Sequence, residues 1–177
     1  MGQLAEQLAT VAVEARSPDG NVRAWAHGRD VVGVEFAAGS YGCYSETVVV
    51  SQLEQLATRV WSRYKRAYVE VMDAYLDWPE RDGESGVDAA FRERVEHLVA
   101  AGRSASAAVA ARSVGLVRWE FAIAEGTLSR LDVDDFVAEV VGAVAATVAD
   151  YRRQTIVLTA ELYGPPPGHR AVAAAVR

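Results

Sequence analysis

Three short runs of alternating residues, separated by tight-turn sequences, constrain the N-terminal part of this chain more than any other feature. The runs span 11–17, 22–27 and 31–36, and each places β-branched or small apolar side chains at every second position. The turns are Pro18-Asp19-Gly20-Asn21 and Gly28-Arg29-Asp30, in which Pro fixes φ while Gly and Asn accept positive φ. Strands joined by such short turns pair antiparallel, so the pattern predicts a three-stranded meander.

Helical periodicity flanks this meander on both sides. Leu4, Leu8 and Val11 predict a short N-terminal helix. Ser51 is expected to open a long helix, because Glu54 stands three residues later and completes a capping box. The apolar stripe of this helix runs for about six turns, which is more than a three-stranded sheet covers, so a second helix is expected to pack on it. The stripe consists of Leu53, Leu56, Ala57, Val60, Trp61, Tyr64, Tyr68, Val71 and Tyr75.

The same order of patterns returns after a charged boundary at 79–86. Residues 88–93 predict a short helix, and residues 94–102 predict either a weak strand or an extension of that helix. Residues 105–111 and 116–122 are further strand candidates. Asp132 is the expected N-cap of a second long helix. The apolar stripe of that helix consists of Phe136, Val140, Val144, Thr147, Tyr151, Leu158 and Leu162.

The repeated element order predicts an α/β fold of the α+β type, built from two tandem copies of one unit: a short helix, a three-stranded antiparallel meander and a long helix. Aligning Val34 with Trp119 gives an offset of 85 (119 − 34), and the long helices align at an offset of 83 (136 − 53). The alternative is that two similar patterns arose by chance in an Ala- and Val-rich chain. The expected organisation is a first repeat at 1–78, a linker at 79–86, a second repeat at 87–163 and a flexible Pro/Ala-rich tail at 164–177.

The two copies are expected to pack through their long helices as an intramolecular pseudo-dimer. The chain would then be either a monomer of this kind or a homodimer. Aromatic side chains on the helices suit such an interface. The expected interface residues are Trp61, Tyr64, Tyr68, Val140, Val144 and Tyr151.

The sequence offers no pattern for catalysis or metal binding. Cys43, the only cysteine, has no neighbouring Lys or Arg to lower its pKa. Gly39-Ser40-Tyr41-Gly42 lacks the Gly-Lys-Ser/Thr ending of a phosphate-binding loop, and the acids near Asp132 fit helix capping better than a cation site. The chain is therefore expected to be non-enzymatic, with no cofactor and no metal. Its histidines stand apart from one another, at His27, His97 and His169.

Six cations are candidates for contact with nucleic acid. Three arginines at i, i+4 and i+7 fall on one side of the first long helix, where aligned charges suit phosphates. The alternative is a solvated face opposite the core stripe. Because the net charge is −6, a basic patch would act against an unfavourable overall field. The candidates are Arg59, Arg63, Lys65 and Arg66 in the first copy, with Arg152 and Arg153 in the second.

Nothing in the sequence predicts a membrane segment. The apolar stretches are interrupted by charged residues well before the roughly 18 residues that a membrane span needs. The first six residues have neither the basic nor the apolar region of a signal peptide. With a single cysteine, a reducing cytoplasm is the expected location.

The stretch from Val11 to about Tyr75 resembles the YbaB/EbfC family of nucleoid-associated proteins. The similarity lies in the Pro-Asp-Gly-Asn turn, the strands at 22–27 and 31–36, and the long helix after a loop. Residues 95–162 resemble the family more loosely, and Gly164-Pro-Pro-Pro-Gly168 is similar to a Pro-Pro-Gly near the family's C-terminus. The resemblance implies a small homodimer that binds double-stranded DNA with low sequence specificity in the nucleoid. The fused copies would imitate that dimer within one chain.

The resemblance also allows a different function. Related folds occur among accessory proteins of actinobacterial type VII secretion, which implies a protein-interaction module or adaptor that does not bind DNA. The acidic balance of the chain favours this alternative. The Ala-, Val- and Arg-rich, Lys-poor composition is typical of a high-GC actinobacterium.

Overall fold

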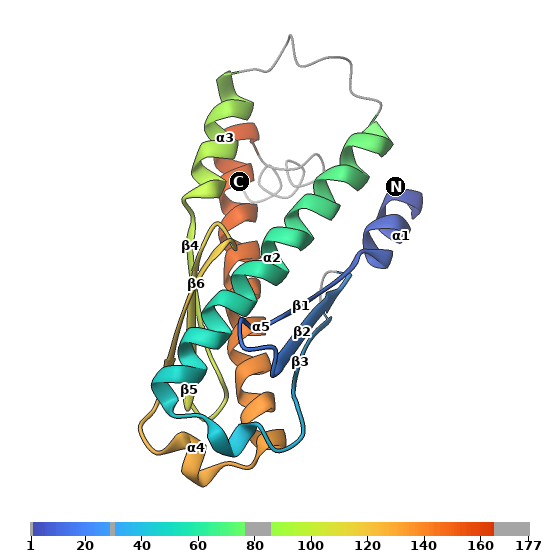
Figure 1. Cartoon of the computed structure of the whole chain (residues 1–177). Helices are drawn as coiled ribbons and strands as arrows, with labels where there is room; N and C mark the ends of the chain where they lie inside the picture. Colours follow the sequence, from blue (N-terminus) through green and yellow to red (C-terminus); the bar gives the residue numbers. More distant parts are fainter. Residues whose placement is uncertain (1, 29–30, 77–85, 165–177) are drawn as a thin grey trace.

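The computed structural model of the protein describes residues 2–28, 31–76 and 86–164 (Figure 1). Apart from Gly164 and Gly86, the expected tail and the expected linker lie outside these residues. The first half contains α1 (Gly2–Thr10), β1 (Ala12–Arg16), β2 (Val22–His27), β3 (Val31–Phe36), the 3-10 turn η1 (Tyr41–Cys43) and α2 (Glu46–Leu76). The second half contains α3 (Gly86–Glu96), β4 (Val99–Arg103), β5 (Val109–Val114), β6 (Arg118–Ile123), α4 (Thr127–Arg130) and α5 (Val133–Tyr163).

The fold is α+β, with two separate three-stranded antiparallel sheets. The first sheet has the order β1-β2-β3 and the second has the order β4-β5-β6. The predicted first meander is confirmed, and β2 and β3 have the predicted bounds. Val22 pairs with Phe36 and Ala24 pairs with Val34, so the predicted apolar positions share one buried face.

The second meander is shifted relative to its prediction. The strand expected at 105–111 begins at Val109, because residues 104–108 form a turn. The backbone N–H of Ser104 closes this turn by donating to Val109 O at 2.9 Å. Ala107 takes a positive φ of 60° in this turn, a conformation expected of Gly. The strand expected at 116–122 begins at Arg118. Both alternatives for 94–102 hold in part, since α3 runs to Glu96 and β4 begins at Val99.

The first long helix begins before Ser51, so the predicted capping box is wrong. The helix begins at Glu46, and the Ser45 hydroxyl accepts a hydrogen bond from Val48 N at 3.4 Å. Glu54 instead accepts a hydrogen bond from Phe121 N at 3.2 Å and covers the free edge of β6. The predicted cap of the second long helix is confirmed: the Asp132 side chain accepts from Asp135 N at 2.9 Å.

The strands and long helices of the two halves correspond at a constant offset of 87 residues (109 − 22 = 87). Helices α2 and α5 each contain 31 residues and begin 87 residues apart (133 − 46). The expected offsets of 85 and 83 are therefore wrong, and the residue that corresponds to Val34 is Phe121 rather than Trp119. Three backbone hydrogen bonds of the first half have equivalents 87 residues later in the second half. In the first half, Ser17 N donates to Val22 O, Gly28 N to Val11 O and Ala37 N to Asn21 O. In the second half, the equivalent bonds run from Ser104 N to Val109 O, from Gly115 N to Leu98 O and from Ala124 N to Ala108 O.

Each long helix packs on two strands of its own sheet and on one strand of the other sheet. Helix α2 contacts β1, β2 and β6, while α5 contacts β4, β5 and β3. Part of the apolar stripe of α2 is thus covered by β6, and a second helix, α1, also packs on α2. Trp61 of α2 stacks on Trp119 of β6 with ring centroids 5.8 Å apart, and Phe36 of β3 meets the edge of Phe136 of α5 at 6.0 Å. One hydrophobic core therefore joins both halves.

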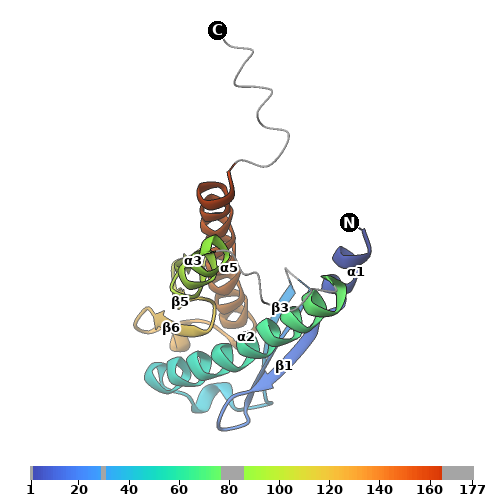
Figure 2. The same cartoon turned by 90° about the horizontal axis from the view of Figure 1, so that it is seen from above.

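The C-terminal ends of the long helices extend beyond this core, each paired with a short helix. Helix α1 packs on α2, and α3 packs on α5. The two pairs diverge when the molecule is seen from above (Figure 2). Within the described residues, no helix combines the length and apolar composition that crossing a membrane requires.

Candidate nucleic-acid interface

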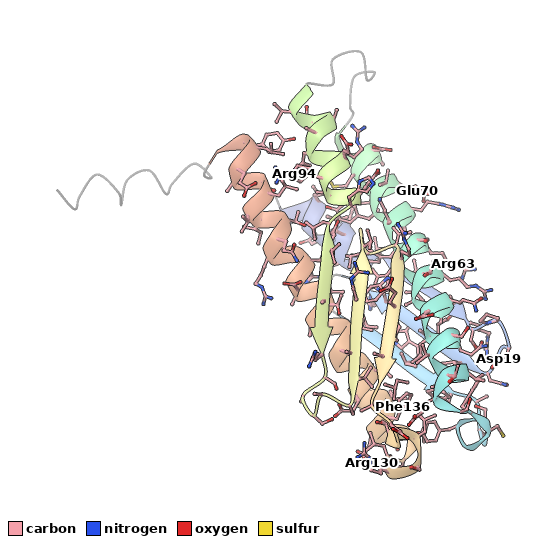
Figure 3. All side chains as sticks on the ribbon, turned by 90° about the vertical axis from the view of Figure 1, so that its left-hand side faces the viewer. Asp19, Arg63, Glu70, Arg94, Arg130 and Phe136 are labelled. Atoms are coloured by element: carbon pink, nitrogen blue, oxygen red, sulfur yellow. The ribbon has the colours of Figure 1, made fainter. Side chains whose placement is uncertain are left out.

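Three of the predicted cations form an exposed row on α2 beside the edge of the first sheet. Arg59, Arg63 and Arg66 are all exposed, and Figure 3 shows Arg63 projecting from α2 away from the second sheet. Arg59 Nη1 donates to the backbone carbonyl of Arg16 at 2.9 Å. Arg63 Nη1 donates to the backbone carbonyl of Glu14. The helix therefore holds two of the three guanidinium groups against β1.

The edge position of β1 explains these bonds. Strand β1 pairs only with β2, so the carbonyl groups of alternate residues along its other side need partners. Residues 14 and 16 carry such carbonyls, and two arginines one helical turn apart reach both. A guanidinium group has five N–H donors, so one bond to a neutral carbonyl leaves its charge and most of its donors available.

The row keeps its positive charge. Among the described carboxylates, none lies within 4 Å of Arg59, Arg63 or Arg66 as an ion-pair partner. The nearby Glu14 carboxylate is bound to Arg23 at 2.6 Å. Arg16 is exposed at the end of β1, but its side chain lies on the outer face of the first sheet, where it lines a small cavity with Arg23 and Glu35. The arginine row is defined here as Arg59, Arg63 and Arg66.

The other three predicted cations do not join the row. Lys65 points to the second half, where its Nζ lies 3.8 Å from a carboxylate oxygen of Glu96. Arg153 binds the Asp150 carboxylate at 2.9 Å. Arg152 is partly buried and has an interaction partner of its own. The position that corresponds to Arg63 is Asp150, which accepts a hydrogen bond from Ala101 N of β4 at 3.0 Å. The free edges of β1 and β4 are thus bonded by side chains of opposite charge, Arg63 in the first half and Asp150 in the second.

The six residues expected between the copies divide into two groups. Trp61, Val140 and Val144 are buried in the shared core and line a common small cavity with residues from both halves. Tyr64 and Tyr68 follow Trp61 outward along α2, with ring centroids 5.5 Å apart for Trp61 and Tyr64 and 6.5 Å apart for Tyr64 and Tyr68. Tyr151 is partly buried on α5, and this burial raises the pKa of its hydroxyl.

A polar cluster at the first turn escaped sequence reasoning. The Asp19 carboxylate accepts hydrogen bonds from Ser17 Oγ at 2.5 Å, from Tyr44 OH at 2.5 Å and from Asn21 N at 3.1 Å. Burial and the bond to Asp19 raise the pKa of Tyr44 to about 12. Burial opposes ionisation of Asp19, but the hydrogen bonds from Ser17 and Tyr44 hold the pKa of that carboxyl below its usual value. The cluster fastens the turn to the start of α2.

The described residues bring together no metal site. No group of three or more His, Cys, Asp or Glu side chains among them is placed to hold a metal ion. Cys43 is exposed in η1.

Comparison with known proteins adds no identification. No family model matches the chain, and neither the curated proteins nor the solved structures give a match. The function of the chain has to be inferred from its own residues.

Proposed function

We propose that this protein binds duplex DNA through the arginine row, with little sequence preference and without catalysis. The observation that carries the proposal is the alignment of Arg59, Arg63 and Arg66 on α2, two of them anchored on β1 carbonyls and none paired with a described carboxylate. The resemblance of the element order to the YbaB/EbfC family favours the same function. Association with the nucleoid follows from it.

The physical basis is phosphate binding by fixed guanidinium groups. Residues 59 and 66 lie about 10 Å apart along the axis of α2, since a helix rises about 1.5 Å per residue. Arginine suits phosphate oxygens because its planar donors bind them in pairs. Side chains that are already held against β1 lose less conformational entropy on binding. Contacts of this kind position a protein on DNA without reading bases, so low specificity is expected.

The electrostatics predict modest affinity and strong salt dependence. The net charge of −6 repels DNA as a whole, so binding depends on the local row. If all three arginines contact phosphates, the logarithm of the binding constant should fall with the logarithm of salt concentration with a slope of about −2.7.

We also propose that the halves descend from a duplicated unit, so that one chain forms the arrangement that two copies would form as a homodimer. The constant offset of 87 residues supports this history, because it holds for strands, turns and long helices alike. The reciprocal packing of each long helix on the third strand of the other half supports the pseudo-dimer. A chance similarity of patterns would not preserve the register through both turns of the meander and into the long helix.

Fluorescence anisotropy with a short labelled duplex at about 50 mM salt tests the DNA proposal, because phosphate-driven binding is strongest at low ionic strength. Arg63→Glu should weaken binding about tenfold and equally for unrelated sequences, whereas Arg63→Lys, which keeps the charge, should retain most of it. Arg130→Glu, a remote reversal on α4, is the control. No binding by the unaltered protein at micromolar concentration would reject the proposal.

A second candidate is a protein-interaction module or adaptor that does not contact nucleic acid. Its support is apolar exposure in the second half, where Ile156 is 69% and Val157 is 58% exposed. A groove of about 530 Å³ between α3 and α5 has Leu98, Val157 and Leu158 among its lining residues. Recovery of nucleic acid but no stoichiometric protein with the chain from its native host would count against this candidate.

A further inference from the structure

The outer face of the second sheet is open and carries three arginines. Strands β4, β5 and β6 face the viewer in Figure 3, and no other element lies in front of them. The arginines project between small residues: Ala101 and Ala122 are exposed and Ala110 is half-buried. The outer face is defined by Val99, Ala101, Arg103, Ala110, Arg112, Val114, Arg118, Glu120 and Ala122.

The strand register places the three arginines on a diagonal. Arg103 pairs with Ala110, one row beyond the pair formed by Ala101 and Arg112. Arg118 pairs with Val114, one row before Arg112. Neighbouring strands lie about 4.8 Å apart and a row spans about 6.8 Å, so successive arginine Cα atoms lie about 8 Å apart. The diagonal crosses all three strands.

The face is positively charged in an acidic protein. Three arginines and one glutamate give it a net charge of +2, whereas the chain carries −6. Glu120 binds Arg112 at 2.9 Å. Neither Arg103 nor Arg118 has an ion-pair partner within 4 Å among the described carboxylates. Two guanidinium groups therefore keep their full binding capacity.

The corresponding face of the first sheet shows that the fold does not require this charge. Glu14 and Glu35 occupy the positions of Ala101 and Ala122, and both lie within 4 Å of Arg23. Trp25 occupies the position of Arg112 and packs over Gly33. Arg16 occupies the position of Arg103, so the first face carries two arginines and two glutamates. It is therefore neutral and partly covered by an aromatic ring, although its strand pairing is equivalent.

We propose that the outer face of the second sheet binds an acidic, extended segment of a partner protein. Carboxylates at alternate positions of an extended chain lie about 6.8 Å apart, a spacing that long arginine side chains on an 8 Å diagonal can match. The alanines between them let the backbone of the segment lie close to the sheet. A short segment feels mainly the local +2 charge, whereas a duplex extends beyond the face and meets the acidic remainder of the protein.

A fluorescein-labelled peptide of alternating Glu and Val is a suitable probe, with an alternating Lys and Val peptide as its control. The whole chain should bind the acidic peptide with a half-saturation below about 1 mM at low salt and should not bind the basic one. Arg103→Glu and Arg118→Glu should each weaken this binding about tenfold. Arg16→Glu, the equivalent of Arg103 on the first sheet, should leave it unchanged.

Three results would overturn the inference. The first is that the acidic peptide does not bind. The second is that Arg16→Glu weakens peptide binding as much as Arg103→Glu does. The third is that Arg103→Glu and Arg118→Glu reduce the affinity for duplex DNA as much as the affinity for the peptide. The last result would make the face part of a nucleic-acid surface. Arg103→Ala and Arg118→Ala, which remove charge without reversing it, should give the same order of effects. The thermal unfolding of each variant shows that the sheet remains folded.

Discussion

The two halves of the molecule share the order and register of their strands and long helices, but their surfaces differ. Strands, turns and long helices correspond at an offset of 87 residues, and equivalent backbone bonds close the turns. At the helix position that faces the edge strand, the first half has Arg63 and the second has Asp150. One turn beyond the arginine row, exposed Glu70 corresponds to Val157, which lines the groove. Backbone bonding and apolar burial thus fix the architecture, and the exposed positions remain free to carry different binding surfaces.

Some inward-facing residues also differ between the halves, and substitutions at these positions should change the free energy of unfolding by different amounts. Val49 corresponds to Phe136, Ala15 to Gly102 and Ala26 to Ser113. Both members of the first pair are fully buried. A substitution at any of these positions tests whether the two halves contribute equally to the free energy of unfolding.

The largest effect is expected at Phe136. Its ring is fully buried and contacts Phe36 at 6.0 Å and Tyr41 at 5.5 Å, both from the first half. Phe136→Ala should lower the free energy of unfolding by about 4 kcal/mol, while Val49→Ala should cost about 2 kcal/mol. Urea unfolding measures both. Equal losses would mean that Phe136 contributes no more than its counterpart to the shared core.

The next effect is expected where β4 approaches α5. A Cβ atom on Gly102 would lie 2.3 Å from Thr147 N, so Gly102→Ala must push the strand away from the helix. A loss of about 3 kcal/mol is expected by the same measurement. Ala15→Gly, at the equivalent position, removes one methyl group and should cost about 1 kcal/mol. A Gly102→Ala variant as stable as the unaltered protein would contradict the close approach.

A gain in stability is expected at Ser113. Its hydroxyl is buried and has no hydrogen-bond partner among the described atoms. Ser113→Ala removes this unpaired group and should raise the free energy of unfolding by about 1 kcal/mol. The reverse change in the first half, Ala26→Ser, should lower it by a similar amount. Destabilisation by Ser113→Ala would show that the hydroxyl does have a partner.

Much of the fold follows from local sequence, and the departures have physical causes. Strands β2 and β3 are bounded by residues with fixed turn chemistry, so their limits were predictable. The turn at 104–108 has neither Pro nor Gly, and Ala107 takes the positive φ that Gly20 takes in the first half, so the strand start was misplaced. The spacing of Ser51 and Glu54 fits a capping box and so suggested a later helix start, but Val49 is fully buried within α2.

The candidate site was predictable only in part. The spacing of Arg59, Arg63 and Arg66 placed them on one face of a helix. Their anchoring on β1 depends on how α2 lies against the sheet edge, which no local pattern encodes.

The smallest stability effect is expected from the turn cluster, in a pH titration. The pKa of Asp19 is lowered below its usual 3.8 in the folded protein, so its stabilising contribution is present above pH 4 and is lost as the pH falls. The corresponding residue, Ser106, accepts a hydrogen bond from Ala108 N at 3.2 Å and does not ionise. Asp19→Ser should therefore remove this acid-dependent loss, which should stay below about 1 kcal/mol because the carboxyl is exposed. An unchanged pH profile would exclude a role for Asp19.

The difference in surface between the halves is tested most directly by matched charge reversals at positions 66 and 153, which are 87 residues apart (153 − 66). Duplex titrations at about 50 mM salt should show that Arg66→Glu weakens binding about tenfold and makes the salt slope shallower by about 1. Arg153→Glu, in a half that lacks the row, should change the affinity less than about twofold. Equal losses from the two reversals, or a larger loss from Arg153→Glu, would contradict the assignment of DNA binding to the first half.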